Sequence, residues 1–214
     1  MIAALYVERG GVYSAQPGIA PWDEERDARL YRGPYPVVAH PPCERWGRYW
    51  GGGPSVRQPR LLGDDGGCFA HALWSVRTFG GVLEHPEASH AWRWFGLVAP
   101  LINGGWTHAE PYALEWPRPR GRQAWTCCVF QGHYGHEAPK ATWLYYVGRR
   151  QPPELIWGRA RGRRLDEGFH SAAERRAARA RGQKPRKRLS AKECAATPVA
   201  FREVLIDIAK RAGR

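Results

Sequence analysis

The sequence predicts an α/β fold, in which helices pack against a sheet, followed by a basic C-terminal tail. Short apolar runs alternate with helical patterns along residues 1–150, and Gly or Pro marks the connections between them. The 214 residues are 43% hydrophobic and 25% charged, which is near the globular average and excludes a wholly disordered chain. We expect one α/β domain over residues 1–150 and a basic tail with a C-terminal helix over residues 151–214.

The expected elements follow from local patterns, and no internal repeat is visible. Strands are expected where short apolar runs end at Gly, Pro or polar turns, namely at residues 3–7, 36–39, 82–84, 125–130 and 141–147. Helices are expected at 23–31, at 64–78 and at 201–211.

Local signals mark where these helices begin and end. Acidic residues fill the first turn of the 23–31 segment, which suits the helix dipole. Asp64 and Asp65 open the second helix, and Gly80 ends it. Ser190 or Thr197 is the expected cap of the last helix.

Positive charge is concentrated in one segment. The chain carries a formal net charge of +13, and residues 149–188 contain fourteen Arg and Lys against four Asp and Glu. Such a segment is typical of proteins that bind a polyanion, most simply nucleic acid. Arg outnumbers Lys there, which favours bidentate phosphate contacts over the alternative of a solvated tail.

The sequence contains no run of about 18 apolar residues, so we expect no membrane span. The start, MIAALYVERGG, has no leading basic region, so we expect no signal peptide. The five cysteines are odd in number and form no secreted-type framework. We therefore expect a cytoplasmic protein.

One arrangement of residues points to chemistry. Cys43 follows the strand expected at 36–39 through a Pro-Pro pair, and Glu84 ends the strand expected at 82–84. Ligands bind outside the carboxyl ends of parallel strands, so thiol and carboxylate would share one crevice if these strands are neighbours. A thiolate is a strong nucleophile, and nearby cations lower a thiol pKa. Local candidates for that role are His40, Arg45 and Arg48.

Several motifs resemble those of DNA cytosine-5 methyltransferases. VVAHPPCERWG resembles the strand that runs into Pro-Pro-Cys, and VLEHPEAS resembles the Glu-Asn motif, with His85 in place of Asn. APKATWLYYVG resembles a later motif, and RLSAKECAATPVAF faintly resembles a C-terminal one. The motifs keep the family's order, mainly over residues 35–150. The chain is also similar to small phage and prophage proteins of this kind, which implies a bacterial host cell.

This resemblance implies a Rossmann-like, methyltransferase-type sheet with helices. It also implies a reaction in which a cytosine is flipped out of DNA, Cys43 attacks C6, and Glu84 hydrogen-bonds or protonates N3. Lys140 stands where the family has an Arg and would help to hold the base or the thiolate. S-adenosylmethionine would supply a methyl group to C5.

The cofactor motif departs from the family pattern. Only Gly10 and Gly11 remain of the Gly-rich turn, and Asp23, or Glu24 or Glu25, would supply the acidic ribose ligand. The chain has little room for a separate target-recognition domain. The expected nucleic-acid contacts are Arg45, Arg48, Arg161, Arg163, Arg164, Lys187 and Arg188.

Other interpretations remain open. A related pyrimidine modification could use another donor, or the chain could be a catalytically inactive DNA-binding relative. Aromatic residues beside Arg can stack on unpaired bases, and they occur here as Trp46, Tyr49, Trp50, Trp92, Trp94 and Phe95. A zinc site is a further alternative to the prediction of no metal, from pairs with ligand-like spacing: His40 with Cys43, Cys68 with His71, and His133 with His136, near Cys127 and Cys128.

Overall fold

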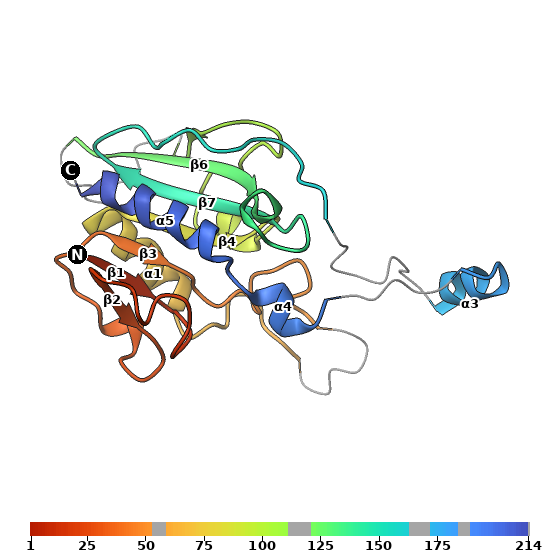
Figure 1. Cartoon of the computed structure of the whole chain (residues 1–214). Helices are drawn as coiled ribbons and strands as arrows, with labels where there is room; N and C mark the ends of the chain where they lie inside the picture. Colours follow the sequence, from red (N-terminus) through yellow and green to blue (C-terminus); the bar gives the residue numbers. More distant parts are fainter. Residues whose placement is uncertain (53–58, 111–120, 163–171, 184–188, 214) are drawn as a thin grey trace.

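The structure of the chain is a computed structural model. It describes residues 1–52, 59–110, 121–162, 172–183 and 189–213. Within these residues the protein is a mixed α/β structure built on one sheet of seven strands (Figure 1). The strands are β1 (Ile2–Leu5), β2 (Ile19–Trp22), β3 (Val37–Ala39), β4 (Gly81–Pro86), β5 (Thr107–His108), β6 (Gln123–Phe130) and β7 (Ala141–Gly148).

The sheet has a parallel half and an antiparallel half. Its order is β2-β1-β3-β4-β7-β6-β5. Neighbours among β2, β1, β3 and β4 run parallel, whereas β7, β6 and β5 each run antiparallel to the strand before them. The carboxyl ends of β1, β2, β3 and β4 therefore meet at one edge of the sheet.

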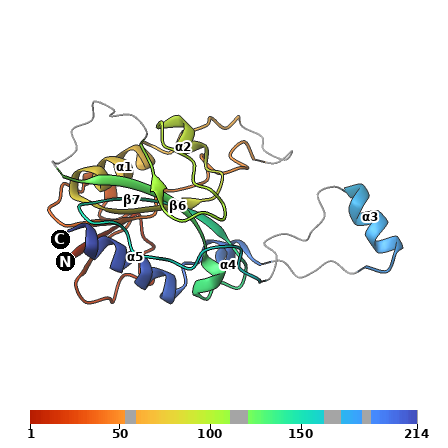
Figure 2. The same ribbon diagram turned by 90° about the horizontal axis from the view of Figure 1, so that it is seen from above.

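Helices cover both faces of the sheet (Figure 2). The first face carries α1 (Cys68–Phe79) and α2 (His90–Trp94), with Phe69 and Trp92 in its core. The other face carries α5 (Val199–Ala212), which buries Phe201 and Leu205. Short 3-10 turns lie at Ala28–Leu30 and Gln131–Tyr134.

Two helices lie outside these layers. The short helix α4 (Ala191–Ala195) leads into α5, and α3 (Ala172–Ala180) stands away from the sheet in both views (Figures 1 and 2). The helix α5 belongs to the segment 151–214 of the sequence, yet it contacts β1, β3, β4 and β7. The C-terminal end of the chain is thus part of the sheet's hydrophobic core.

All five expected strands are present, as β1, β3, β4, β6 and β7, with ends shifted by a few residues. The expected helix at 64–78 begins later, at Cys68, because the Asp65 carboxylate accepts hydrogen bonds from the amides of Gly67 and Phe69. It ends before Gly80 as expected.

The expected helix at 23–31 is wrong. Asp23 accepts hydrogen bonds from the amides of Glu25 and Arg26, and Asp27 accepts one from the amide of Arg29. Such side-chain bonds favour turns over a continuous helix. The buried apolar residues of the segment, Ala28 and Tyr31, lie only at its end, and a 3-10 turn forms there.

The C-terminal helices differ from expectation in their caps. Ser190 forms a capping box with Glu193 and so begins α4, a helix that the sequence pattern did not predict. Pro198, and not Thr197, precedes α5. The strands β2 and β5 and the helix α2 were also not predicted.

The connection from β1 to β2 contains no helix. Residues 6–18, all described, form turns that pack beside α5. Tyr13 is buried in the α5 core, and the Arg202 guanidinium donates a hydrogen bond of 2.6 Å to the Val12 carbonyl. This loop makes the crossover between the parallel strands β1 and β2 and carries Tyr13 to within 2.9 Å of His40.

His85 is buried between β4 and the helices of the first face. Its ring lies 5.2 Å from that of Phe69, centroid to centroid. Burial lowers the pKa of His85 from 6.5 to about 4. The negative charge of Glu84 raises this pKa, but burial is the larger effect. The imidazole is therefore neutral in the folded protein at neutral pH.

We expect the free energy of unfolding to fall as the pH drops from 6.5 towards about 4, because in this interval the unfolded chain binds a proton at His85 that the folded protein does not. The full effect is about 3 kcal/mol. Urea unfolding at several pH values measures it. His85→Asn should lose this part of the pH dependence, whereas the exposed control His90→Asn should retain it; equal slopes would contradict the assignment.

Candidate active site

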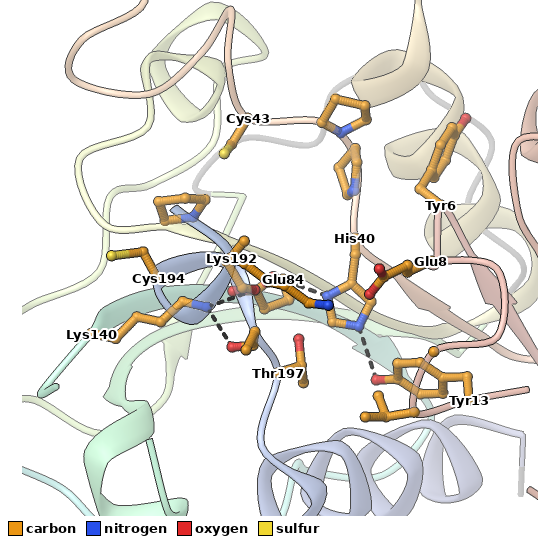
Figure 3. A pocket seen from close by; sticks show the side chains of 17 residues that line it. Tyr6, Glu8, Tyr13, His40, Cys43, Glu84, Lys140, Lys192, Cys194 and Thr197 are labelled. Carbon is orange, nitrogen blue, oxygen red and sulfur yellow. Dashed lines mark hydrogen bonds and ion pairs between the residues drawn. The ribbon is translucent and has the colours of Figure 1, made fainter. Parts of the chain in front are cut away.

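A cavity of about 560 Å³ opens at the carboxyl ends of β1, β3 and β4 (Figure 3). The two residues that the sequence marks as reactive, Cys43 and Glu84, both line it. Lys140, Tyr13 and His40 line it as well. Cys43 and Glu84 were expected to share one crevice if their strands were neighbours. The strands β3 and β4 are adjacent and parallel.

The register of these two strands places the side chains. Ala39, the last residue of β3, pairs with Leu83, so the next residues along, His40 and Glu84, lie level with one another. The Nδ1 atom of His40 lies 3.0 Å from Oε2 of Glu84. Beyond His40, the stiff Pro-Pro pair leads to Cys43 at the cavity wall.

The Cys43 thiol is not activated in the free protein. Burial raises its pKa, and the charge of Glu84 raises it further, while the Lys140 cation lowers it in part. This differs from the expectation that His40, Arg45 and Arg48 would lower it. The reason is geometric, because His40 bonds to Glu84 and the Arg48 guanidinium pairs with Glu87 at 3.2 Å.

Glu84 is held as a carboxylate. Burial alone would raise its pKa, but the hydrogen bond and charge of His40, with the charge of Lys140, lower it below the ordinary value. The amide Nε2 of Gln131 donates to its other oxygen, Oε1, at 3.2 Å. Both carboxylate oxygens thus have fixed partners.

Lys140 joins the cavity to the helix α4. Its ammonium group donates to the carbonyl oxygens of Ala195 at 3.2 Å and Ala196 at 2.9 Å (Figure 3). Burial lowers the pKa of Lys140, whereas the charges of Glu84 and Cys43 raise it. The ammonium group therefore lies at the cavity, where the sequence places it, but its hydrogen bonds hold the chain beside α4.

We call residues 190–197 the strap. The His136 ring nitrogen Nε2 lies 3.1 Å from the Glu193 carbonyl oxygen, which gives the strap a second attachment. The strap contributes Lys192, Cys194 and Thr197 to the wall of the cavity. One side of the cavity is thus built from the C-terminal part of the chain.

A second cavity, of about 530 Å³, lies beside the first. Tyr6, Glu8 and Pro42 line both cavities. Asp23 lines the second, so this predicted cofactor ligand faces an open space. The predicted glycines do not, because Gly11 lines the first cavity and Gly10 lies outside both sets of lining residues.

The predicted nucleic-acid residues are placed in part. Arg45 is half-buried, and Arg48 and Arg161 are exposed. The others, Arg163, Arg164, Lys187 and Arg188, lie outside the described residues.

The residues of the zinc alternative lie apart or serve other contacts. His71 lies 3.0 Å from the Tyr6 hydroxyl, and Cys127 and Cys128 are buried on opposite faces of the sheet. His133 lies 3.0 Å from the Gly158 carbonyl oxygen. Within the described part of the chain, no group of three or more His, Cys, Asp or Glu is arranged to hold a metal ion.

Sequence reasoning missed two groups that line or support the cavity. Tyr13 lies in a loop with no motif, and Gln131 lies in the turn after β6. The strap had a visible signal, since Ser190 followed by Glu193 is a capping-box pattern.

Comparison of the chain with family models, curated proteins and solved structures gives no match. Among the described residues, no helix is long and apolar enough to cross a membrane.

We expect Cys43 to react with iodoacetamide at a rate that rises with pH and reaches its midpoint above 9.0, the ordinary thiol value, because burial and Glu84 raise its pKa. Lys140→Met should slow the reaction at pH 8 by about three- to tenfold. Peptide mass spectrometry would follow the label on each cysteine.

Arg48→Met is the matched control, because it removes a cation that is paired with Glu87. It should leave the rate unchanged, and Glu84→Gln should raise it. Rapid labelling of the unmodified protein at neutral pH would contradict this description of the thiol.

Proposed function

We propose that the chain is an enzyme that modifies cytosine in DNA, through a covalent adduct between Cys43 and a flipped base, with methyl transfer to C5 as the reaction. One observation carries the proposal. A thiol and a carboxylate from the ends of two adjacent parallel strands line a single cavity. The motif resemblance requires this juxtaposition of Cys43 and Glu84.

The sheet topology supports the proposal of a Rossmann-like, methyltransferase-type fold. From β1 the chain goes first to β2 on one side and then to β3 and β4 on the other. Ligands in open α/β sheets bind at such a switch point, outside the carboxyl ends of the strands. Both cavities lie at this position.

The cavity suits the chemistry of a flipped pyrimidine. Its volume of about 560 Å³ is within the ordinary range for small-molecule sites. Sγ of Cys43 forms a bond to C6 of the ring, and the electron pair of the C5–C6 double bond moves into the ring. Glu84 would pass a proton to N3 and so neutralise the negative charge that develops there. The Lys140 cation favours the thiolate form of Cys43.

The second cavity is where we propose that S-adenosylmethionine binds. The carboxylate of Asp23 suits ribose hydroxyls, and the ring of Tyr6 offers a surface for the rest of the molecule. The cofactor would supply the methyl group. The two cavities share a wall of Tyr6, Glu8 and Pro42, so donor and base would occupy neighbouring spaces.

A second candidate is a pyrimidine modification that uses another donor. It is favoured by the position of Gly10 and Gly11, because the remnant of the Gly-rich turn does not line the second cavity. This candidate keeps Cys43 and Glu84 in the same roles and differs only in the group transferred.

DNA is the proposed partner, and a bacterial cytoplasm with phage-encoded DNA modification is the proposed setting. The net charge of +13 favours a polyanion. Arg176 and Arg179 are exposed on the helix α3, which stands away from the sheet, and the exposed Arg181 follows this helix. Lys192 adds a cation at the cavity itself.

We expect the protein to form a covalent adduct with a DNA duplex that carries 2-pyrimidinone in place of one cytosine. This base accepts a thiol at C6 and traps it without methyl transfer. Cys43→Ala should abolish the adduct and keep DNA affinity, and Glu84→Gln should slow its formation by about 100-fold or more. Denaturing gels with and without S-adenosylmethionine give the readout.

Cys194→Ala is the matched control, because Cys194 lines the same cavity and has no role in the attack. It should form the adduct at the normal rate. Tight DNA binding without any adduct would instead identify a non-catalytic relative. An adduct that S-adenosylmethionine does not influence would favour the other donor.

We expect DNA affinity to fall steeply with salt, because phosphate contacts release counterions. Replacing Arg176, Arg179 and Arg181 together by Ser should reduce the slope of log affinity against log salt concentration by about 2 to 3. Fluorescence anisotropy over a salt series measures it. Arg93→Ser, on α2, is the control and should retain the slope; a flat salt dependence in the unmodified protein would contradict the DNA assignment.

A further inference from the structure

A chain of hydrogen bonds leads through the cavity wall to Glu84. The hydroxyl of Tyr13 lies 2.9 Å from Nε2 of His40, and Nδ1 of His40 lies 3.0 Å from Oε2 of Glu84. Figure 3 shows the three side chains in a row along the cavity. They come from the β1–β2 loop, the end of β3 and β4, so the fold brings them together from three separate segments.

The proposed attack requires a proton at N3 of the base, and Glu84 alone cannot supply it. When Sγ bonds to C6, N3 of the ring becomes basic and takes up a proton. At rest Glu84 is a carboxylate with both oxygens accepting hydrogen bonds, from His40 and from Gln131. Its lowered pKa keeps it ionised near neutral pH. A neighbouring acid must therefore supply the proton.

We propose that His40 is this acid and that Tyr13 is the positioning residue that fixes its ring. This inference rests on the proposed function. In its imidazolium form His40 gives the proton on Nδ1 to the Glu84 carboxylate, which passes it to N3. The neutral imidazole keeps its other proton on Nε2, donated to the Tyr13 oxygen. After C5 has accepted the methyl group and has lost its proton to water, the C5–C6 double bond re-forms and Sγ leaves as the thiolate. N3 then returns its proton by the same path, so the relay is restored.

The surroundings fit this role. Histidine is the side chain that exchanges protons near neutral pH. The His40 and Glu84 side chains are only 14% and 12% exposed, so bulk water has little access to their contact. Burial raises the pKa of Tyr13, so its hydroxyl remains neutral and cannot compete as an acid.

Several charged groups face the pair and are part of its pH response. Glu8, Cys43, Lys140 and Lys192 line the same cavity. From α5, Arg202 and Glu203 act on Tyr13. Adduct formation then needs Cys43 as a thiolate and His40 as an imidazolium, so its rate should pass through a maximum with pH.

The test measures the rate of adduct formation on the 2-pyrimidinone duplex over a range of pH, for the unmodified protein and for His40→Asn. The Asn amide keeps a hydrogen-bond donor near the position of Nδ1 but cannot transfer a proton. We expect the rate to fall by about 100-fold and the alkaline limb of the profile to disappear. DNA affinity should be unchanged. Tyr13→Phe should cause a smaller loss and keep the alkaline limb.

A purely structural role for His40 would lower the rate by one factor at every pH and leave the alkaline limb in place. That result, or full activity in His40→Asn, would overturn the relay. No Cys43 adduct in the unmodified protein would instead remove the proposed function.

A second measurement needs no DNA. Carbon-13 NMR of the Glu84 carboxyl group follows its titration directly. The pKa of Glu84 should rise in His40→Asn, because the charge and hydrogen bond of His40 lower it in the unmodified protein. Arg48→Met should leave it unchanged. A Glu84 titration that does not respond to His40→Asn would overturn the relay even if the adduct never forms.

Discussion

The parallel pairing of β3 with β4 is the contact on which the site depends. Its register sets Val38 against Val82 and Ala39 against Leu83, so the residues that follow bring His40 level with Glu84. A slip by one residue would exchange the two faces of β4. The Glu84 carboxylate would then enter the aromatic core, and the neutral His85 ring would face the cavity.

Gly81 permits the close approach of these strands. Its φ of 126° is a conformation that residues with a side chain rarely adopt. A Cβ atom there would also run into the backbone of Val37. Gly81, the first residue of β4, is thus required for the strand pairing that assembles the cavity.

The sequence predicted the parts of the fold whose signal is local. Five strands are short apolar runs between turn residues, and α1 has apolar residues on one face, so both kinds of element were visible. The helix expected at 23–31 failed because the Asp23 and Asp27 carboxylates bind nearby backbone amides and so favour turns. The convergence of Cys43 with Glu84 was predictable as a condition on strand adjacency, and the pairing of β3 with β4 meets that condition.

The rest of the site depends on tertiary packing. Tyr13 reaches His40 because the β1–β2 loop packs beside α5, a contact between distant parts of the chain. The pKa of the Cys43 thiol also depends on tertiary packing. Cations near Cys43 in sequence suggested a lowered pKa, but burial and the position of Glu84 decide its direction. Neighbours in space, and not neighbours in sequence, set the electrostatics of this cavity.

The strap links the cavity to the basic tail. After β7 the chain still packs on the body as far as Ala160, which is buried in the core, and it lies on the body again at Ser190, where the strap begins. Lys140 and His136 then fix the strap at the cavity wall, and α5 continues from it into the core. The chain is therefore anchored on the body at Ala160 and again at the strap, and the second anchor lies beside the cavity. A polyanion bound between these two anchors would be held close to the cavity, which is a physical means of presenting a base to Cys43 in the proposed reaction.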